Sequence, residues 1–122
     1  MIAVGARPAP LASLNVESQR VLTYREAIMQ EHHPTSVIIV GGGAIGVEFA
    51  TIWNAYGSQV TVVEILPRIL PMEDEQISLE LTKAFKKGGI NVLTSAKVGQ
   101  VDMGTESVRV TVSDDRGSQV LE

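Results

Sequence analysis

The sequence predicts an α/β fold: a three-layer domain with a central parallel sheet and an appended antiparallel β-meander. The first observation is residues 36–64, which read in order as an apolar strand, a glycine-rich turn, a helix and a second apolar strand. That order joins two parallel strands through a crossover helix. The second observation is the region from Lys97 onward, where apolar and polar residues alternate as they do in antiparallel strands.

The chain before this unit has two parts. Residues 1–22 hold a short apolar run that ends in Gly5 and prolines, followed by a stretch of little periodicity. We expect them to be the end of a strand from a preceding domain and a linker, and residues 23–122 to form the domain itself. Thr23 and Glu26 fit a capping box that starts a short helix, which Pro34 ends.

The adjacent residues His32 and His33 fall at the end of this short helix. Neighbouring residues do not share a helix face, and no third ligand is spaced nearby, so a metal site is not predicted. We expect both side chains at a solvated helix C-terminus, where the helix dipole favours cations. The sequence predicts no catalytic and no metal-binding residue in this chain.

Residues 41–46 carry three glycines in the spacing G-x-G-x-x-G, directly after an apolar run typical of a strand buried on both faces. Gly41 permits the sharp turn from strand to helix, Gly43 lets a pyrophosphate approach the backbone, and Gly46 allows close helix–strand packing. The N–H groups and the positive dipole end of the helix would hold the phosphates. Helical spacing predicts the buried face of this helix: Ile45, Phe49, Ile52, Trp53 and Tyr56.

Glu64 ends the second apolar run, 64 − 41 = 23 positions after Gly41. A carboxylate about 20 positions after the first glycine binds the ribose hydroxyls in a dinucleotide site. A 2′-phosphate in that place would set like charges side by side. The sequence therefore predicts a Rossmann-like site for NAD rather than NADP, with a purely structural glycine turn as the alternative.

The remaining elements follow in order. Residues 65–75 form a proline-punctuated loop, and a helix follows with an expected apolar face at Ile77, Leu81, Ala84 and Phe85. Gly88 and Gly89 end that helix, and residues 90–93 read as a short buried strand. Residues 98–103 and 107–113 read as antiparallel strands, with a turn at residues 114–117.

Composition narrows the functional classes. The 122 residues carry a net charge of −4 with no basic patch, so nucleic acid and anionic membranes are not expected partners. Cysteine is absent, which removes disulfides, thiolate catalysis and thiolate metal sites. No apolar run approaches the ~20 residues of a membrane span, and no signal peptide opens the chain. We expect a cytoplasmic protein.

With these segments in view, the chain resembles the nicotinamide-binding domain of the flavin-dependent (pyridine nucleotide) disulfide oxidoreductases. Residues 3–8, AVGARP, are similar to the family's ATG-x-x-P segment at the exit from the flavin domain, with Val4 in place of threonine. Residues 41–50, GGGAIGVEFA, match the family's nucleotide turn. Residues 60–75, VTVVEILPRILPMEDE, resemble the continuation typical of its dihydrolipoamide dehydrogenase branch.

The resemblance implies an intact enzyme in which electrons pass from dihydrolipoamide through a cysteine disulfide to FAD and then, as hydride, to NAD⁺. This chain lacks the cysteine pair and the histidine–glutamate pair of the C-terminal dimerisation domain. We therefore expect a fragment that binds part of the cofactor and does not turn over alone. The implied partners are NAD(H), a lipoyl-bearing acyltransferase subunit and a homodimer partner.

The resemblance also implies the cofactor contacts. Glu48 would lie toward the nicotinamide and Val98 near the adenosine, with helix-dipole stabilisation and plain sheet packing as their respective alternatives. Gly5 and Ala6 would contact FAD held by the preceding domain. The full implied set is Gly41, Gly42, Gly43, Ala44, Ile45, Gly46, Val47, Glu48, Glu64, Val98, Gly5 and Ala6.

Other functions stay open on the sequence. A FAD-binding unit uses the same glycine turn and terminal acid, although in this family the flavin turn lies near the N-terminus. Family members that act on glutathione or mercury, and NADH oxidases, share the nucleotide turn. A nucleotide-sensing regulatory domain is the alternative without catalysis.

Overall fold

The computed structural model describes residues 18–122; the expected strand end near the N-terminus and the contacts of Gly5 and Ala6 lie outside the described residues. The helices and strands are α1 (Tyr24–Ile28), β1 (Ser36–Val40), α2 (Ala44–Ala55), β2 (Gln59–Val63), α3 (Glu75–Lys87), β3 (Asn91–Leu93), β4 (Lys97–Met103), β5 (Val108–Asp114) and β6 (Gly117–Leu121).

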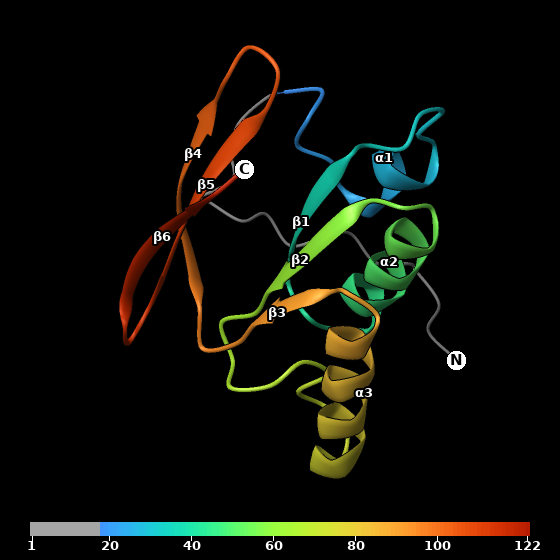
Figure 1. Cartoon of the computed structure of the whole chain (residues 1–122), viewed down its shortest axis with the longest axis vertical. Helices are drawn as coiled ribbons and strands as arrows, with labels where there is room; N and C mark the ends of the chain where they lie inside the picture. The colour runs from blue at the N-terminus through green and yellow to red at the C-terminus, as the bar shows by residue number, and fades with distance from the viewer. Residues whose placement is uncertain (1–17) are drawn as a thin grey trace, which may run out of the picture.

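Strands β1, β2 and β3 form a parallel sheet in the order β1-β2-β3. The first two strands pair along their whole length, from Ser36 opposite Gln59 to Val40 opposite Val63. Helix α2 connects β1 to β2, and the connection from β2 to β3 contains α3. Figure 1 shows both helices on one side of this sheet and the strands β4 to β6 on the other. The predicted α/β fold with a central parallel sheet is confirmed.

The last three strands form an antiparallel meander in the order β4-β5-β6, with a register irregularity between Val98 and Val101. Asp114 and Arg116 build the turn into β6: the Arg116 N–H donates to Asp114 Oδ1 at 2.8 Å, and the guanidinium pairs with Oδ2. The side-chain hydrogen bond from Arg116 lowers the pKa of Asp114. The appended meander and its turn are confirmed.

Two adjacent residues of β2 face opposite layers. Val62 packs in a cluster on the helix side of the sheet, and Val63 packs in a cluster on the meander side. Side chains of a strand alternate between its two faces, so one strand contributes to both clusters. The buried members are Val47, Ala50, Trp53, Val60, Val62, Ile69, Phe85 and Ile90 in the helix-side cluster and Val63, Ala96, Val98, Val110 and Val112 in the meander-side cluster.

Helix α2 buries a face that differs from the predicted one. Ile45, Ile52 and Tyr56 are exposed, and Phe49 is only half-buried. The buried residues are Gly46, Val47, Ala50 and Trp53. The helix approaches the sheet closely at Gly46, next to the glycine turn, and Ala50 and Trp53 continue the same buried face along the helix. Of the predicted face, Trp53 is buried and Phe49 packs half-buried against the helix-side cluster. The prediction was wrong at Ile45, Ile52 and Tyr56.

Two predictions about the first part of the domain are also corrected. The apolar run of β1 is half-buried rather than buried on both faces, and Val40 is exposed. Among the described strands, β1 has a neighbour on one side only. Helix α1 has the predicted capping box but ends at Ile28, so His32 and His33 lie exposed in the segment beyond the helix.

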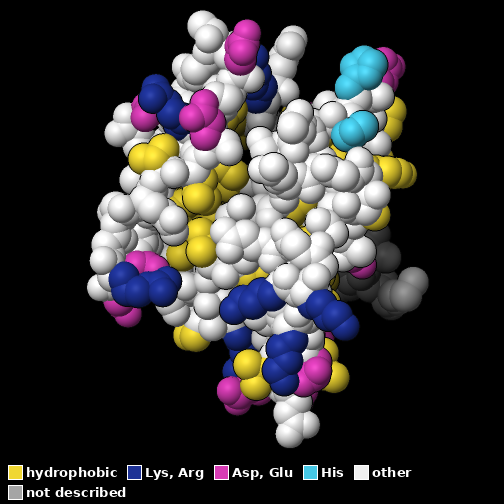
Figure 2. Space-filling model, in the orientation of Figure 1, with side chains coloured by type: hydrophobic (Ala, Val, Ile, Leu, Met, Phe, Trp, Pro, Cys, Tyr) yellow, Lys and Arg dark blue, Asp and Glu magenta, His cyan; other side chains and the backbone are white. Residues whose placement is uncertain are grey.

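Helix α3 begins at the N-cap Asp74 and is followed by Gly88 and Gly89, as the glycines predict. Its buried residues are Ser78 and Phe85, whereas Ile77 and Ala84 of the predicted apolar face are exposed. Figure 2 shows charged side chains of both signs over the lower end of the molecule, where Figure 1 places α3. Within residues 18–122, no helix is long and apolar enough to span a bilayer.

Candidate nucleotide-binding site

The glycine turn joins the carboxyl end of β1 to the start of α2. Gly41 has a φ of +108°, a conformation that favours glycine, and its N–H donates to the Val63 carbonyl at 2.9 Å. A Cβ on Gly46 would lie 1.9 Å from the Gly41 carbonyl oxygen and 3.4 Å from Ile39 Cγ2. The turn therefore needs glycine at both positions, one for its backbone angle and one for close packing.

Gly43 differs from these two glycines because none of residues 18–122 crowds it. Its φ is −74°, and a Cβ at this position would have no heavy atom within 4 Å among those residues, its chain neighbours aside. It is the N-cap of α2 and has no side chain to cap the helix. The N–H groups of the first helical residues, Ala44, Ile45 and Gly46, have no partner within a helix by its geometry. The space above Gly43 is thus open and faces free donors and the positive helix end, which suits an anion.

Glu64 lies directly after β2 and reaches back to the glycine turn. Its side chain is buried, and the residue is 6% exposed. Oε2 accepts the Gly42 N–H at 2.7 Å, and Oε1 accepts the Leu66 N–H at 2.8 Å. An ionised carboxylate has about four acceptor positions, so each oxygen can accept a further bond from a ligand hydroxyl. The structure places the carboxylate beside the turn, at the edge where a dinucleotide site would need it.

Gly42 is held by the protein itself. Its N–H donates to Glu64, and its carbonyl accepts the Leu70 N–H at 2.7 Å. A Cβ at this position would lie 2.7 Å from Ile69 Cγ2. The sequence placed Gly42 among the residues that contact a cofactor, and the structure shows both of its backbone polar groups bonded within the chain. Its principal role here is to join the glycine turn to the loop after β2.

The remaining residues predicted to contact the cofactor are Val47, Glu48 and Val98, and the structure does not bring all three together at the glycine turn. Val47 is buried in the helix-side cluster, and its N–H donates to the Gly43 carbonyl at 3.0 Å. Glu48 is exposed on α2 and lies just beyond its first turn, which contains no acid. Val98 is buried in the meander-side cluster and offers little surface to a ligand. The turn and Glu64 are brought together; Val98 belongs to another layer.

Sequence reasoning missed the part played by the loop between β2 and α3. Ile69 is 0% exposed and packs against Gly42, and Leu70 has a φ of +47°, which is uncommon for leucine. Arg68 is half-buried, and its Nε has no hydrogen-bond partner among the described residues. Proline punctuation indicated a loop there but gave no signal that it supports the glycine turn. No group of three or more metal-binding side chains occurs in residues 18–122.

Comparison with known proteins places the chain in one family. A family model described as pyridine nucleotide-disulphide oxidoreductase matches residues 1–121. Similar curated proteins are named dihydrolipoyl dehydrogenase: one from Mycobacterium bovis is 46% identical over 99% of this chain, and one from Bacillus subtilis is 41% identical over 99%. The chain spans 26% of the length of each of these relatives.

Solved structures give the same fold. LpdA from Mycobacterium tuberculosis has a TM-score of 0.81 and 31% identity, with 96% of this chain and 25% of that chain covered. An NAD-dependent persulfide reductase from A. fulgidus also has a TM-score of 0.81, at 25% identity, with 98% and 23% covered. Shape alone therefore does not separate these two relatives, whereas the sequence is more similar to the first.

Proposed function

The chain belongs to the pyridine nucleotide-disulphide oxidoreductase family, and from this premise we propose that it binds NAD(H) through its glycine turn and Glu64. The observation that carries the proposal is the hydrogen bond between Glu64 Oε2 and the Gly42 N–H. It ties the carboxylate that would select the sugar to the turn that would hold the phosphates. The two recognition elements are thereby fixed relative to each other before a ligand arrives.

The residues fit the ligand in chemistry and in space. A pyrophosphate would approach over Gly43, where no described residue other than its chain neighbours has an atom within 4 Å of the place that a Cβ would take. The N–H groups of Ala44, Ile45 and Gly46 would donate to its oxygens. Glu64 would accept the two hydroxyls of the adenosine ribose. Bound NAD⁺ supplies a hydride acceptor, and the residues of this chain bind and orient it.

Glu64 favours NAD over NADP. A 2′-phosphate would stand close to a carboxylate that is buried and held by two N–H donors. At about 4 Å and an effective dielectric constant of about 20, each pair of like charges is opposed by about 4 kcal/mol before screening. Arg68 is the nearest basic residue in sequence, and its Nη2 is directed to the Pro71 carbonyl at 3.4 Å. We therefore propose that the acid decides the specificity.

The wider role follows from the curated relatives. We propose that residues 23–122 are the NAD-binding domain of a dihydrolipoyl (dihydrolipoamide) dehydrogenase and position the nicotinamide for hydride exchange with FAD. In this proposal residues 1–22 connect to a flavin domain that holds most of the FAD. The substrate would be dihydrolipoamide carried by an acyltransferase subunit, and the enzyme would act as a homodimer. Identities of 41% to 46% to dihydrolipoyl dehydrogenases support this choice over persulfide reduction.

Titration of the 122-residue chain with NADH and with NADPH, followed by isothermal calorimetry, tests the proposal. We expect NADH to bind at least about tenfold more tightly, because one like-charge contact outweighs the 1.4 kcal/mol that tenfold represents. Glu64→Gln keeps the size of the side chain and removes its charge. This variant should narrow the ratio between the two dissociation constants, a measure that is insensitive to any general loss of stability.

Glu106→Gln serves as the matched control, because it makes the same charge change at an exposed residue in the turn between β4 and β5. It should leave the NADH to NADPH ratio as in the wild type. Tighter binding of NADPH, or no binding of either nucleotide, would contradict the proposed function.

A further inference from the structure

The buried side-chain hydroxyl of Ser78 donates its hydrogen bond to a residue outside its own helix. The residue is 1% exposed and lies in the first part of α3, where its N–H donates to the Asp74 carbonyl at 3.1 Å. Its Oγ donates to the Ile69 carbonyl at 2.6 Å, nine positions earlier in the chain. Serine and threonine hydroxyls inside helices usually bond the carbonyl four residues back.

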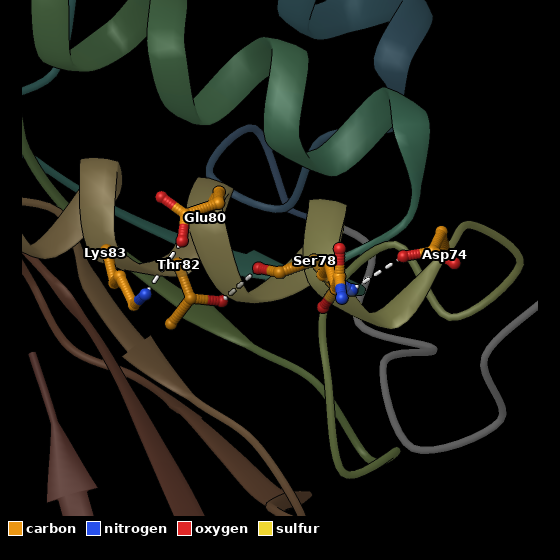
Figure 3. A network of polar contacts seen from close by, with 6 residues as sticks. Asp74, Ser78, Glu80, Thr82 and Lys83 are labelled. Atoms are coloured by element: carbon orange, nitrogen blue, oxygen red, sulfur yellow. Dashed lines mark hydrogen bonds and ion pairs between the residues drawn. The ribbon is translucent and has the colours of Figure 1, made fainter.

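Thr82 and Thr51 show that ordinary arrangement in this molecule. Thr82 Oγ1 donates to the Ser78 carbonyl at 2.8 Å, and Thr51 Oγ1 donates to the Val47 carbonyl at 2.9 Å. Figure 3 shows Thr82 and Ser78 joined along α3, near the exposed Glu80–Lys83 ion pair. Of these hydroxyls, Ser78 alone connects its helix to another segment.

The segment that Ser78 holds is the one that packs on the glycine turn. Ile69 lies against Gly42, and the next residue, Leu70, donates its N–H to the Gly42 carbonyl at 2.7 Å. Leu70 has a left-handed backbone, which persists where surrounding contacts determine it. Near the start of the same loop, the Leu66 N–H donates to Glu64. A short series of contacts thus runs from α3 through the loop to the two parts of the proposed nucleotide site, the glycine turn and Glu64.

We infer that Ser78 is a positioning residue for nucleotide binding: its hydroxyl fixes Ile69 and Leu70 against Gly42, which pre-organises the glycine turn. The inference rests on the proposed function. Without the hydroxyl, the buried Ile69 carbonyl loses its donor, and a buried acceptor left unpaired is costly. The loop gains freedom, and part of the binding free energy is then spent on ordering the turn.

The test compares Ser78→Ala with Thr82→Val, which removes a hydroxyl from the same helix without touching the loop. Dissociation constants for NADH and for ADP-ribose are measured on the 122-residue chain, well below the unfolding midpoint of every variant. Ser78→Ala should weaken both ligands by a similar factor of about 5 to 30, since both share the pyrophosphate and the adenosine ribose. Thr82→Val should bind both as the wild type does.

Amide hydrogen exchange gives a readout that general destabilisation would not reproduce. In Ser78→Ala the Leu70 N–H should exchange faster, while the N–H groups of Ser58 and Ile90, which bond to Trp53 and Phe85, keep their wild-type protection. Ser78→Cys retains a weak donor of similar size. Its Leu70 exchange rate and its dissociation constants should lie between those of the wild type and Ser78→Ala, which keeps the test available if the alanine variant does not fold.

The outcomes separate this inference from the proposed function. If the wild type binds NADH and Ser78→Ala binds it equally well, or if Thr82→Val is weakened as much as Ser78→Ala, the positioning role is overturned and the proposed function stands. If the wild type binds no nucleotide, the proposed function fails. Unchanged Leu70 exchange in Ser78→Ala would then overturn the coupling between α3 and the turn as well.

Discussion

The three glycines of the turn act through different physical constraints. Gly41 is required by its positive φ, and Gly46 by a carbonyl oxygen 1.9 Å from where its Cβ would stand. Gly43 has an ordinary φ and open space around it. Within the part of the chain that the structure describes, the fold therefore gives a reason for the first two glycines and none for the third. In the proposed function, a ligand that approaches the backbone at Gly43 would supply that reason.

Gly43→Ala should consequently separate binding from folding. The added methyl group meets no atom of the other described residues beyond its chain neighbours, so the unfolding midpoint should stay close to that of the wild type, apart from a small loss at the N-cap. The methyl group would occupy the space over the turn, and the dissociation constant for NADH should rise about tenfold or more. Thermal unfolding and calorimetric titration measure the two effects.

Gly99→Ala is the control for this change, since its Cβ would make an ordinary contact of 3.5 Å with the Thr111 carbonyl in the meander. Gly99→Ala should change neither the unfolding midpoint nor the dissociation constant for NADH. Gly46→Ala should instead disrupt the turn and lower stability strongly. NADH binding by Gly43→Ala as tight as by the wild type would mean that no phosphate passes over Gly43.

Single elements were predictable where short-range chemistry decides them. The capping box of α1 forms as expected: the Glu26 carboxylate accepts the Thr23 N–H at 2.8 Å and also the Thr23 hydroxyl. The hydrogen bond from the Thr23 side chain is the largest cause that lowers the pKa of Glu26, followed by backbone N–H groups. The contribution of Glu26 to the helix is therefore complete above the ordinary glutamate pKa. It is lost as the pH falls through the lowered value in the folded chain.

Thr23→Ala should raise the pKa of Glu26 toward its ordinary value, because the leading hydrogen-bond donor is removed. Titration of the Glu26 carboxyl carbon by NMR measures this shift. Thr105→Ala, at an exposed residue in the turn between β4 and β5, should leave the Glu26 titration unchanged. A Glu26 pKa that is the same in Thr23→Ala and in the wild type would show that the capping box does not persist in solution.

Helix faces were less predictable than helix ends. The spacing of Ile45, Ile52 and Tyr56 indicated a buried stripe on α2, yet these residues are exposed, and Gly46 and Ala50 face the sheet. Periodicity gives the existence of a face, whereas the distance between helix and sheet decides which face is used. Here the glycine turn imposes a close approach at Gly46, which turns the side of α2 that also carries Ala50 and Trp53 toward the sheet.

The molecule as a whole is built on the two faces of one sheet. The helix-side cluster and the meander-side cluster meet in β2, where Val62 and Val63 are neighbours. Trp53, the only tryptophan in the sequence, lies buried in the helix-side cluster. Its fluorescence therefore reports directly on one cluster and only indirectly on the other. Trp53 fluorescence can therefore show whether a change in the meander-side cluster also affects the helix-side cluster.

Val62→Ala and Val112→Ala each remove buried methyl groups, one from each cluster. Each should lower the free energy of unfolding by about 1.5–3 kcal/mol, from lost burial and the cavity left behind. Because the layers share β2, we expect both variants to shift the denaturant transition seen by Trp53 fluorescence. Val120→Ala, at an exposed valine of β6, is the matched control and should shift it little. A Val112→Ala transition that moves by circular dichroism but not by fluorescence would show that the layers unfold separately.

The sequence alone was sufficient for the order of elements, the glycine turn, the capping box and the meander, because residues close in the chain decide each of them. It also singled out Glu64 by its spacing from Gly41, and the structure places the Glu64 carboxylate on the Gly42 N–H, beyond the ends of the parallel β1–β2 pair. The tertiary structure decided which face of α2 is buried and how the turn is supported. Ile69 packs against Gly42 from a distant part of the chain, and Ser78 bonds to the Ile69 carbonyl from the following helix. No local pattern encodes such contacts.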